Sequence, residues 1–486
     1  MGSIFSTSRS ISSLSSVIEH ISGTSSTMPS RKRKASLNEN SSDIEPKRFK
    51  LNTPDYVYQK LFVEGLNSDI QIHALGHTWR LHKLYLEQCE YFHALFQGNW
   101  SDSGKDEYYM QIDDDNICFK GLNNVFASLY NNEIEIDEQY IASICGAASM
   151  LNLESVLEKC QIQLADYLRD KEKLLICLRL SDRYGFVKRM KEAINVLKYM
   201  FCHFCLDETF LRGLQKSWLI TLFSQQFVCV RESEMDLYRA IRNWIFLTEC
   251  PYARLGDENS IALFFESSFF NRHKYFDLLR LLRVSHLVSL QANLKLIRSD
   301  GIIPRKLLKN VICDQWQMLL RSEETTTGFP EVIDDNEFYA SCYRFGRAGI
   351  SPLSRITWRR LGYFFGVDLL VTYDQGYLRL ARNGSMAPTQ HQISVKHVDI
   401  MKLHYSGHER RGDETRCIVC ADNGVVLLDT LKQSKTFNLD RNVELGKFKL
   451  PPNGQKVSIH LFCLPFAPIH QLTHYWDDLM SWGGGN

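Results

Sequence analysis

The stretch that most constrains the fold is residues 68–96, where a strand period gives way to a helix period. Apolar and polar residues alternate over 70–74 and again over 79–81, with a turn expected at Gly76 and His77. This period of two predicts a half-buried β-hairpin. The apolar residues that follow have the spacing of one helix face: Leu84, Leu86, Phe92, Leu95 and Phe96.

The length and charge of the chain bound what it can be. With 486 residues it is too long for one core, and about three folded units are expected. Lys plus Arg number 57 against 56 Asp plus Glu, so no global field attracts nucleic acid, and we expect no direct binding of nucleic acid. The 14 cysteines lack the spacing of a disulfide framework, no cleavable signal peptide is recognisable, and no apolar run is long enough to span a bilayer. These features predict a protein of a reducing compartment.

The elements after the hairpin have a recognisable order. Apolar spacing predicts a strand near 108–112, a helix over 119–130 and two further helices between 141 and 160. This order, together with the pairs His82-Lys83, Tyr91-Phe92 and Leu129-Tyr130, resembles the BTB (POZ) domain over residues 55–168. The resemblance implies an α/β protein-docking module that forms a homodimer.

The loop over residues 98–104 carries the most informative pair of side chains. BTB adaptors of cullin-RING ubiquitin ligases have a hydrophobic-x-Glu motif here, and Trp100-x-Asp102 is similar with a shorter acid. An exposed aromatic anchor beside a carboxylate has the composition of an interface hot spot. The resemblance therefore implies that Trp100, Asp102 and Tyr130 bind cullin-3. The alternative is a turn in which Trp100 folds back on its own domain.

Cys89 stands where the resemblance leads us to expect a serine helix cap.

The N-terminal tail, residues 1–54, is rich in serine and poor in aromatic residues, and we expect it to be disordered. Its start, Met-Gly-Ser-Ile-Phe-Ser, matches the N-myristoylation pattern with Gly2 as acceptor, which predicts membrane contact; a chance match is the alternative. Two basic clusters predict nuclear import, against the alternatives of a solvated charge run or contact with anionic lipid. They comprise Arg31, Lys32, Arg33, Lys34, Lys47, Arg48 and Lys50. Together the two signals predict the inner face of the nuclear envelope.

Two further regions follow the BTB-like one. Residues 169–304 are almost wholly helical in pattern, and the segment from Trp218 to Trp244 resembles the all-α BACK domain. Residues 305–345 are expected to be a linker and a helix, with an acidic loop over 323–335. Residues 346–482 alternate in the manner of a β-rich domain. The fold class expected is therefore a multidomain α+β protein.

The stretch from Trp358 to Asn383, containing Gly366-x-Asp368-Leu-Leu-Val-Thr-Tyr373, resembles the C-terminal domain of the germ cell-less family. The order BTB, BACK, β-rich domain and the Met-Gly-Ser start are similar to that family as well. The resemblance implies a cullin-dependent substrate adaptor at the nuclear envelope with a role in germ cell development, whose β-rich domain binds the protein substrate. A non-catalytic scaffold or transcriptional repressor that tethers partners through the BTB dimer is the alternative.

Enzymatic and metal chemistry receives little support. Cys417-x-x-Cys420 and Cys202-His203-Phe204-Cys205 have metal-like or redox-like spacing, but each lacks a second pair and lies in a hydrophobic run. Buried thiols are the preferred interpretation. The commonest catalytic starting motifs are missing, so we predict no catalytic residue, no metal and no cofactor.

Overall fold

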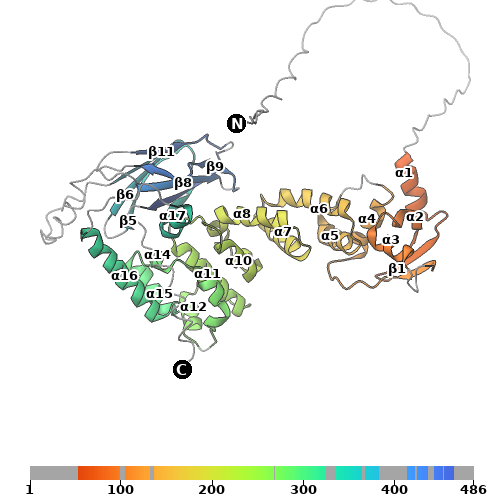
Figure 1. The fold of residues 1–486 in the computed structure, drawn as a ribbon, viewed down its shortest axis with the longest axis horizontal. Helices are drawn as coiled ribbons and strands as arrows, with labels where there is room; N and C mark the ends of the chain where they lie inside the picture. Colours follow the sequence, from red (N-terminus) through yellow and green to blue (C-terminus); the bar gives the residue numbers. More distant parts are fainter. Residues whose placement is uncertain are drawn as a thin grey trace, which may run out of the picture. The chain divides into compact units, whose positions relative to one another are not determined.

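The chain is a multidomain α+β protein with a first region that combines a small sheet and helices, a helical region and a strand-rich region (Figure 1). The computed structural model describes residues 53–98, 104–131, 136–267, 269–324, 334–363, 367–382, 413–421, 424–435, 443–451 and 454–464.

A small mixed sheet organises the first region. Strands β1 (Ile70–Ala74) and β2 (His77–Leu81) form the predicted antiparallel hairpin, and β3 (Glu107–Tyr109) pairs with β1 in parallel. The turn lies one residue earlier than predicted, because Leu75 and Gly76 take the positive φ angles of 49° and 74°. His77 is the first residue of β2 and pairs with Ala74.

Helices cover this sheet and differ from the expectation at two places. The pattern predicted one helix after the hairpin, but the structure has two, α2 (Lys83–Leu86) and α3 (Glu90–Gln97), separated at Cys89. A helical segment that sequence analysis had not predicted, α1 (Thr53–Val57) with η1 (Tyr58–Val63), precedes the sheet. Three helices follow the predicted spacing, α4 (Phe119–Ser128), α5 (Ile141–Met150) and α6 (Glu154–Tyr167), and a short helix that was not predicted, η2 (Glu138–Tyr140), precedes α5.

The helical region begins directly afterwards. Several of its helices start at an aspartate whose carboxylate accepts backbone N–H bonds, as Asp170, Asp207 and Asp257 do, which satisfies donors that a helix start leaves open. The region contains α7 (Lys171–Arg183), α8 (Val187–Phe204), α9 (Glu208–Gly213), α10 (Lys216–Phe223), α11 (Met235–Glu249), α12 (Glu258–Glu266), η3 (Arg272–Tyr275), α13 (Phe276–Leu279), α14 (Val284–Leu287) and α15 (Gln291–Asp300).

Two more helices lead to the strands. Helix α16 (Arg305–Glu324) is longer than the predicted linker helix, so Glu323 and Glu324 belong to it and not to a loop. Asp335 likewise begins α17 (Asp335–Ser341), whose N-cap is Asp334. No helix among the described segments is both long enough and apolar enough to cross a bilayer.

The strand-rich region has two antiparallel sheets. The one that we call the inner sheet comprises β4 (Tyr343–Ile350), β8 (Asp413–Ala421), β9 (Val426–Asp429), β10 (Gln433–Lys435) and β12 (Val457–Leu464). The outer sheet has the order β11-β7-β6-β5, with β5 (Arg355–Tyr363), β6 (Val367–Asp374), β7 (Tyr377–Arg382) and β11 (Val443–Lys447). The β6–β7 turn lies at Gln375 and Gly376, which have the positive φ angles that a two-residue hairpin turn requires.

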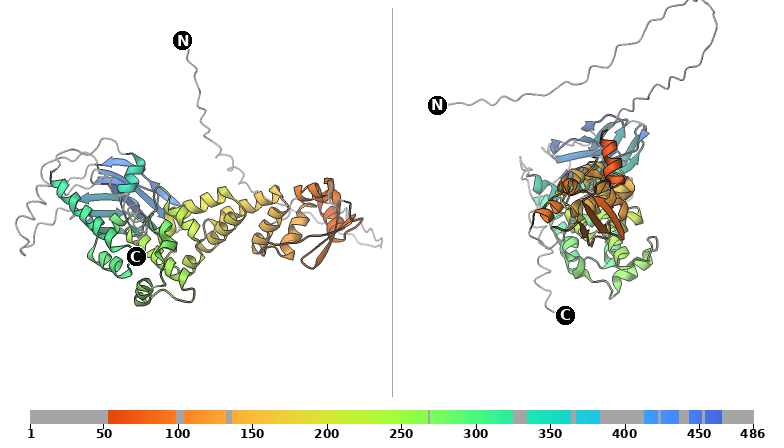
Figure 2. Two further views of the ribbon diagram at one scale, coloured as in Figure 1. Left: turned by 60° about the horizontal axis from the view of Figure 1, so that its bottom comes forward. Right: turned by 90° about the vertical axis from the view of Figure 1, so that its right-hand side faces the viewer.

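The inner sheet is the middle layer of this region. Every residue of β12 is buried, so both faces of that strand are covered. One face packs on the outer sheet through a core that includes Val419, Ile459 and Val371. The other face packs on the helical region through a second core that joins Phe462 to Phe227 and Met200. Figures 1 and 2 show the strands of both sheets gathered into one body.

A buried ion pair lies inside the helical region. The Arg242 Nε atom is 2.8 Å from a carboxylate oxygen of Asp300, and both side chains are almost fully buried. The Tyr238 hydroxyl donates to the same carboxylate over 3.0 Å. Burial raises the pKa of the Asp300 carboxyl above its ordinary value, while Arg242 and Tyr238 oppose that change.

We predict that Asp300→Ala lowers the free energy of unfolding by about 3–5 kcal/mol, because it removes the buried partner of Arg242 and leaves that charge with only the exposed carboxylate of Glu258, 2.8 Å from its Nη1 atom. Replacing both partners by apolar side chains, Arg242→Met with Asp300→Leu, should cost much less. The measurement is the urea midpoint of the helical signal, with Arg239→Met, an exposed position of the same helix, as control. A double variant as unstable as Asp300→Ala would contradict this account.

Candidate partner-binding site

The predicted cullin contacts fall at the connection between α3 and β3. Trp100 and Asp102 lie outside the described residues, and their role stays a prediction. The described ends of the connection are Gly98, whose N–H donates to the Ala94 carbonyl over 3.0 Å, and Gly104.

Aromatic packing supports both sides of that connection. Phe92 of α3 is fully buried, with its ring against Phe96 and Tyr108. The Tyr91 and Tyr108 hydroxyl oxygens are 2.6 Å apart, which joins α3 to β3. Burial raises the pKa of Tyr91 above its ordinary value, so this phenol stays neutral. The Cys89 side chain makes no capping hydrogen bond at the start of α3.

The third predicted contact, Tyr130, is 6% exposed. Its hydroxyl oxygen is 2.9 Å from the backbone nitrogen of His82, which donates to it, and its ring stacks on Tyr85 with 4.3 Å between centroids. The phenol also lies against Phe62 of the N-terminal helical segment. Tyr130 therefore holds α2, the end of α4 and this segment together, and only a small part of its surface is available to a partner.

The signals of the N-terminal tail also lie outside the described residues. This applies to the acylation position Gly2 and to all of the predicted import residues, which are Arg31, Lys32, Arg33, Lys34, Lys47, Arg48 and Lys50.

The cysteine pairs do not form a shared metal site. Cys417 and Cys420 are buried on opposite faces of β8, one in the core between the two sheets and the other in the core against the helical region. Two such thiols cannot bind one ion. Cys202 and Cys205 are buried in and after α8, and within the described segments no three potential ligands gather into a metal site.

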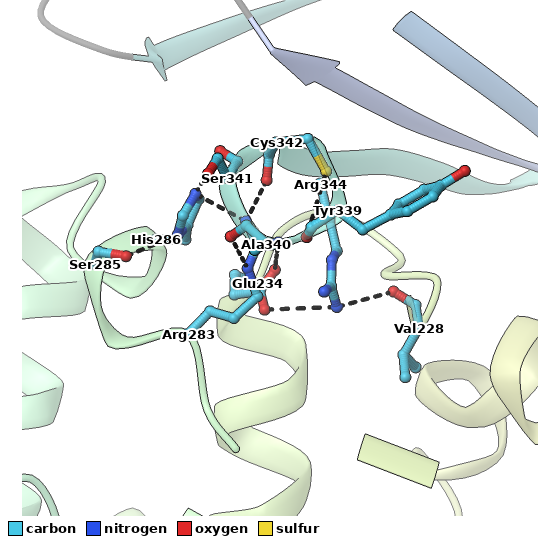
Figure 3. A network of polar contacts seen from close by, with 10 residues as sticks. All are labelled: Val228, Glu234, Arg283, Ser285, His286, Tyr339, Ala340, Ser341, Cys342 and Arg344. Carbon is cyan, nitrogen blue, oxygen red and sulfur yellow. Dashed lines mark hydrogen bonds and ion pairs between the residues drawn. The ribbon is translucent and has the colours of Figure 1, made fainter. Parts of the chain in front are cut away.

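A buried glutamate connects the helical region to the sheets (Figure 3). Glu234, at the start of α11, is 3% exposed and faces two cations. Its carboxylate oxygens lie 3.5 Å from the Arg283 guanidinium and 3.7 Å from that of Arg344 on β4. Arg283 donates in addition to the Ala340 carbonyl at the end of α17, and Arg344 to the Val228 carbonyl. We call these residues the Glu234 network.

A neutral histidine completes the Glu234 network (Figure 3). The His286 Nε2 atom is 3.0 Å from the Ser341 carbonyl oxygen, and its Nδ1 atom is 2.9 Å from the Ser285 hydroxyl. The Arg283 guanidinium nitrogen Nη2 also lies 2.9 Å from Nε2, so the ring contacts α17 and the Glu234 network at the same atom. Burial and the neighbouring Arg283 hold the pKa of His286 well below its ordinary value, so the network contains no third cation.

Backbone contacts reinforce the same junction. Residues 228–233, which we call the strap, run beside β4 and β12: Ser233 forms a β-bridge with Phe345, and His460 Nδ1 is 2.8 Å from the Val230 carbonyl oxygen. Gly346 is required here, because a Cβ atom at this position would lie 2.4 Å from the Ile459 carbonyl and 2.9 Å from that of Val230. The strap therefore lies closer to the sheet than any other residue type at 346 would allow.

Phe227 anchors the start of the strap. Its ring stacks on Tyr339 with 5.3 Å between centroids and meets Phe462 edge-on at the same distance. The Lys198 ammonium and the Arg416 guanidinium lie 3.7 Å and 4.6 Å from the ring centroid, which gives cation–π contacts from both regions.

Two more histidines lie at this junction and are held neutral. Burial lowers the pKa of His460 to about 4. Burial, together with the nearby His460 and Arg231, also lowers the pKa of His203 to about 4. His203 Nε2 is 3.0 Å from the Ser458 hydroxyl of β12, so each histidine bonds across the junction as a neutral ring.

Comparison with known proteins agrees with this architecture. A family model described as the BTB/POZ domain matches residues 58–168. Germ cell-less protein-like 1 of Mus musculus is 30% identical over 369 residues, covering 72% of this chain and 69% of that protein. Protein germ cell-less of Drosophila melanogaster is 29% identical over 380 residues, or 70% and 66% of the two chains. Kelch-like protein 17 of Mus musculus is 28% identical over 182 residues, or 37% and 27%.

We predict that acidification weakens the junction between about pH 6.5 and 4. In the unfolded chain His203 and His460 take up protons near pH 6.5, whereas in the folded chain they do so only near pH 4. Their contribution to stability is thus complete above pH 6.5 and falls with decreasing pH, by up to about 1.4 kcal/mol per pH unit for each ring.

The measurement is the thermal midpoint as a function of pH. His460→Gln cannot become charged, so its midpoint should fall less on acidification than that of the wild type. His93→Gln, at an exposed position of α3, is the matched control and should follow the wild type. Parallel curves for the wild type and His460→Gln would rule out this explanation.

Proposed function

Because this chain belongs to the germ cell-less family of BTB proteins, we propose that it is a non-catalytic substrate adaptor of a cullin-3 ubiquitin ligase. In this proposal the BTB domain binds cullin-3, the strand-rich region binds a protein substrate, and other subunits transfer ubiquitin. No residue of the chain takes part in a covalent step.

The observation that carries the proposal is the position of Trp100-x-Asp102 within the matched BTB domain. The pair lies in the connection between α3 and β3, whose ends the Tyr91–Tyr108 contact joins. An aromatic side chain and a carboxylate two positions apart have the composition of an interface hot spot. The similarity to Kelch-like protein 17 is a second support. It extends over 182 residues, more than the BTB match over residues 58–168, so it includes part of the chain outside the BTB domain.

The strand-rich region is suited to hold a substrate because it is fixed to the helical region. The Glu234 network and the strap leave little freedom between them, so a bound substrate would keep a constant position relative to the helices. We further propose that the BTB domain forms a homodimer, which raises the effective concentration of two substrate sites. Large apolar side chains that remain exposed on it support this: Tyr56, Val63, Leu84 and Tyr109.

We also propose that the protein acts at the inner face of the nuclear envelope during germ cell development. The support is the acylation pattern at Gly2 and the two basic clusters of the tail, together with the family to which the chain belongs. One acyl chain gives only marginal membrane affinity, so a second contact is needed for stable attachment.

We predict that Trp100→Ala with Asp102→Ala weakens cullin-3 binding by at least about 30-fold, the effect of losing one hot-spot residue. Asp102→Glu should strengthen binding, because the longer side chain restores the reach of the usual motif. Co-purification of cullin-3 with the full chain measures both effects. Tyr252→Ala with Glu266→Ala removes an exposed aromatic residue and an exposed carboxylate elsewhere and serves as control. Unchanged retention of cullin-3 would favour the tethering scaffold instead.

For localisation, we predict that Gly2→Ala reduces the nuclear-rim signal of a C-terminally tagged chain while nuclear import persists. Replacing residues 31–34 by glutamine should instead retain the protein outside the nucleus. Fluorescence microscopy distinguishes the two effects. An unaltered rim signal in both variants would argue against an address in the tail.

A further inference from the structure

The outer sheet has one face that the core does not use. Its inner face carries the buried residues Val371, Tyr373 and Leu380, which pack on the inner sheet. The residues between them in sequence, such as Leu370, Thr372 and Arg379, are only partly buried. Successive side chains of a strand point to opposite faces, so these residues belong to the face directed away from the inner sheet.

Strand register arranges the polar residues of this face in rows. One row runs across all four strands as Arg355, Asp374, Tyr377 and Lys447. The next row is Thr357, Thr372, Arg379 and Glu444, and Arg359 begins the row beyond it. Because residues that pair directly lie on the same side of a sheet, these side chains share one surface. We call it the basic face.

Positive charge is in excess on the basic face. Its cations are Arg355, Arg359, Arg379 and Lys447, against Asp374, Glu444 and Asp368, which the alternation along β6 assigns to the same face, so the excess is one charge. The ion pair of Arg355 with Asp374 is loose, with 3.8 Å between the charged atoms and three quarters of the arginine side chain exposed. Such an exposed pair contributes little to stability.

The basic face also borders a free strand edge. Strand β5 ends the order β11-β7-β6-β5, so among the described strands none pairs with its outer side. It supplies both Arg355 and Arg359 to the face. A strand edge can add an extended peptide through main-chain hydrogen bonds, and flanking cations select which peptide is added.

We propose that the basic face, with the edge of β5, binds an extended acidic segment of the protein substrate. The inference rests on the proposed adaptor function and specifies the chemistry of its target. The cationic rows supply attraction to Asp and Glu side chains, and the threonine hydroxyls and the Tyr377 ring supply neutral contacts between them.

The mixed character of the face favours a peptide over nucleic acid. Asp374 and Glu444 are interleaved with the cations and would repel a continuous phosphate backbone, whereas a peptide can place amide or basic groups beside them. The chain as a whole has a net charge of only +1, so no wider field would attract a polyanion.

The test measures binding of a fluorescent peptide of alternating glutamate and serine to the full chain, against the same peptide with glutamine. The wild type should prefer the glutamate peptide, with affinity that falls as salt is added. Arg355→Glu with Arg379→Glu should weaken binding about tenfold, and the milder Arg355→Gln with Arg379→Gln should weaken it less. Asp374→Asn with Glu444→Gln should strengthen it several-fold, an effect in the opposite direction that misfolding would not produce.

Arg179→Glu with Arg298→Glu makes the same change in net charge at exposed positions of the helical region, and should leave the affinity unchanged. Equal binding by the wild type and the Arg355/Arg379 variants would overturn the proposal and leave Arg355 as protection of the exposed edge of β5. Tighter binding of a single-stranded RNA that depends on the same arginines would overturn it too.

Cullin-3 retention separates this inference from the proposed function. A chain that retains cullin-3 but binds no acidic peptide would refute the basic face alone. A chain that fails to retain cullin-3 would refute the adaptor function, whatever the peptide result.

Discussion

A buried carboxylate facing two arginines is the contact on which the arrangement of this protein depends. Glu234 begins a helix, Arg283 begins another, and Arg344 belongs to the first strand of the inner sheet. Removing charges from water is costly, so such a group persists only where each charge has partners. The two guanidinium groups balance the charge of the carboxylate, and the Ala340 and Val228 carbonyl groups accept hydrogen bonds from these arginines, which ties the end of α17 and the strap to the same point.

The strand-rich region is covered on one side by the helical region, through an aromatic core around Phe227. Its inner sheet is therefore the middle of three layers, between the helices and the outer sheet. The outer sheet is consequently the part of the region that can meet a partner. A recognition surface there would be carried on a rigid support, which reduces the entropy that binding must overcome.

Strands and helices could be predicted from the sequence where their apolar residues recur with a regular period. The period of two identified β1 and β2. The first hairpin turn was misplaced by one residue because Leu75 adopts a left-handed backbone, which a leucine rarely does. The predicted single helix was split at Cys89, where apolar spacing continues although the backbone is extended.

The candidate site was only partly accessible to sequence reasoning. A resemblance identified Tyr130, but its burial against His82 and Tyr85 depends on packing that no short motif records. The Glu234 network joins residues that are 49 and 61 positions apart in sequence, so no local pattern could connect Glu234, Arg283 and Arg344. The need for glycine at position 346 depends on the Ile459 and Val230 carbonyl groups, which lie far from it in sequence, so no local pattern indicates it.

The most direct test of this account is hydrogen exchange, followed by mass spectrometry, along the strap and β4 in the wild type and in Gly346→Val. In the wild type we expect both segments to be protected as strongly as β12. In the variant both should lose protection together while the BTB helices remain unchanged. Rapid exchange of the strap in the wild type, or loss of protection in only one of the two segments, would contradict it.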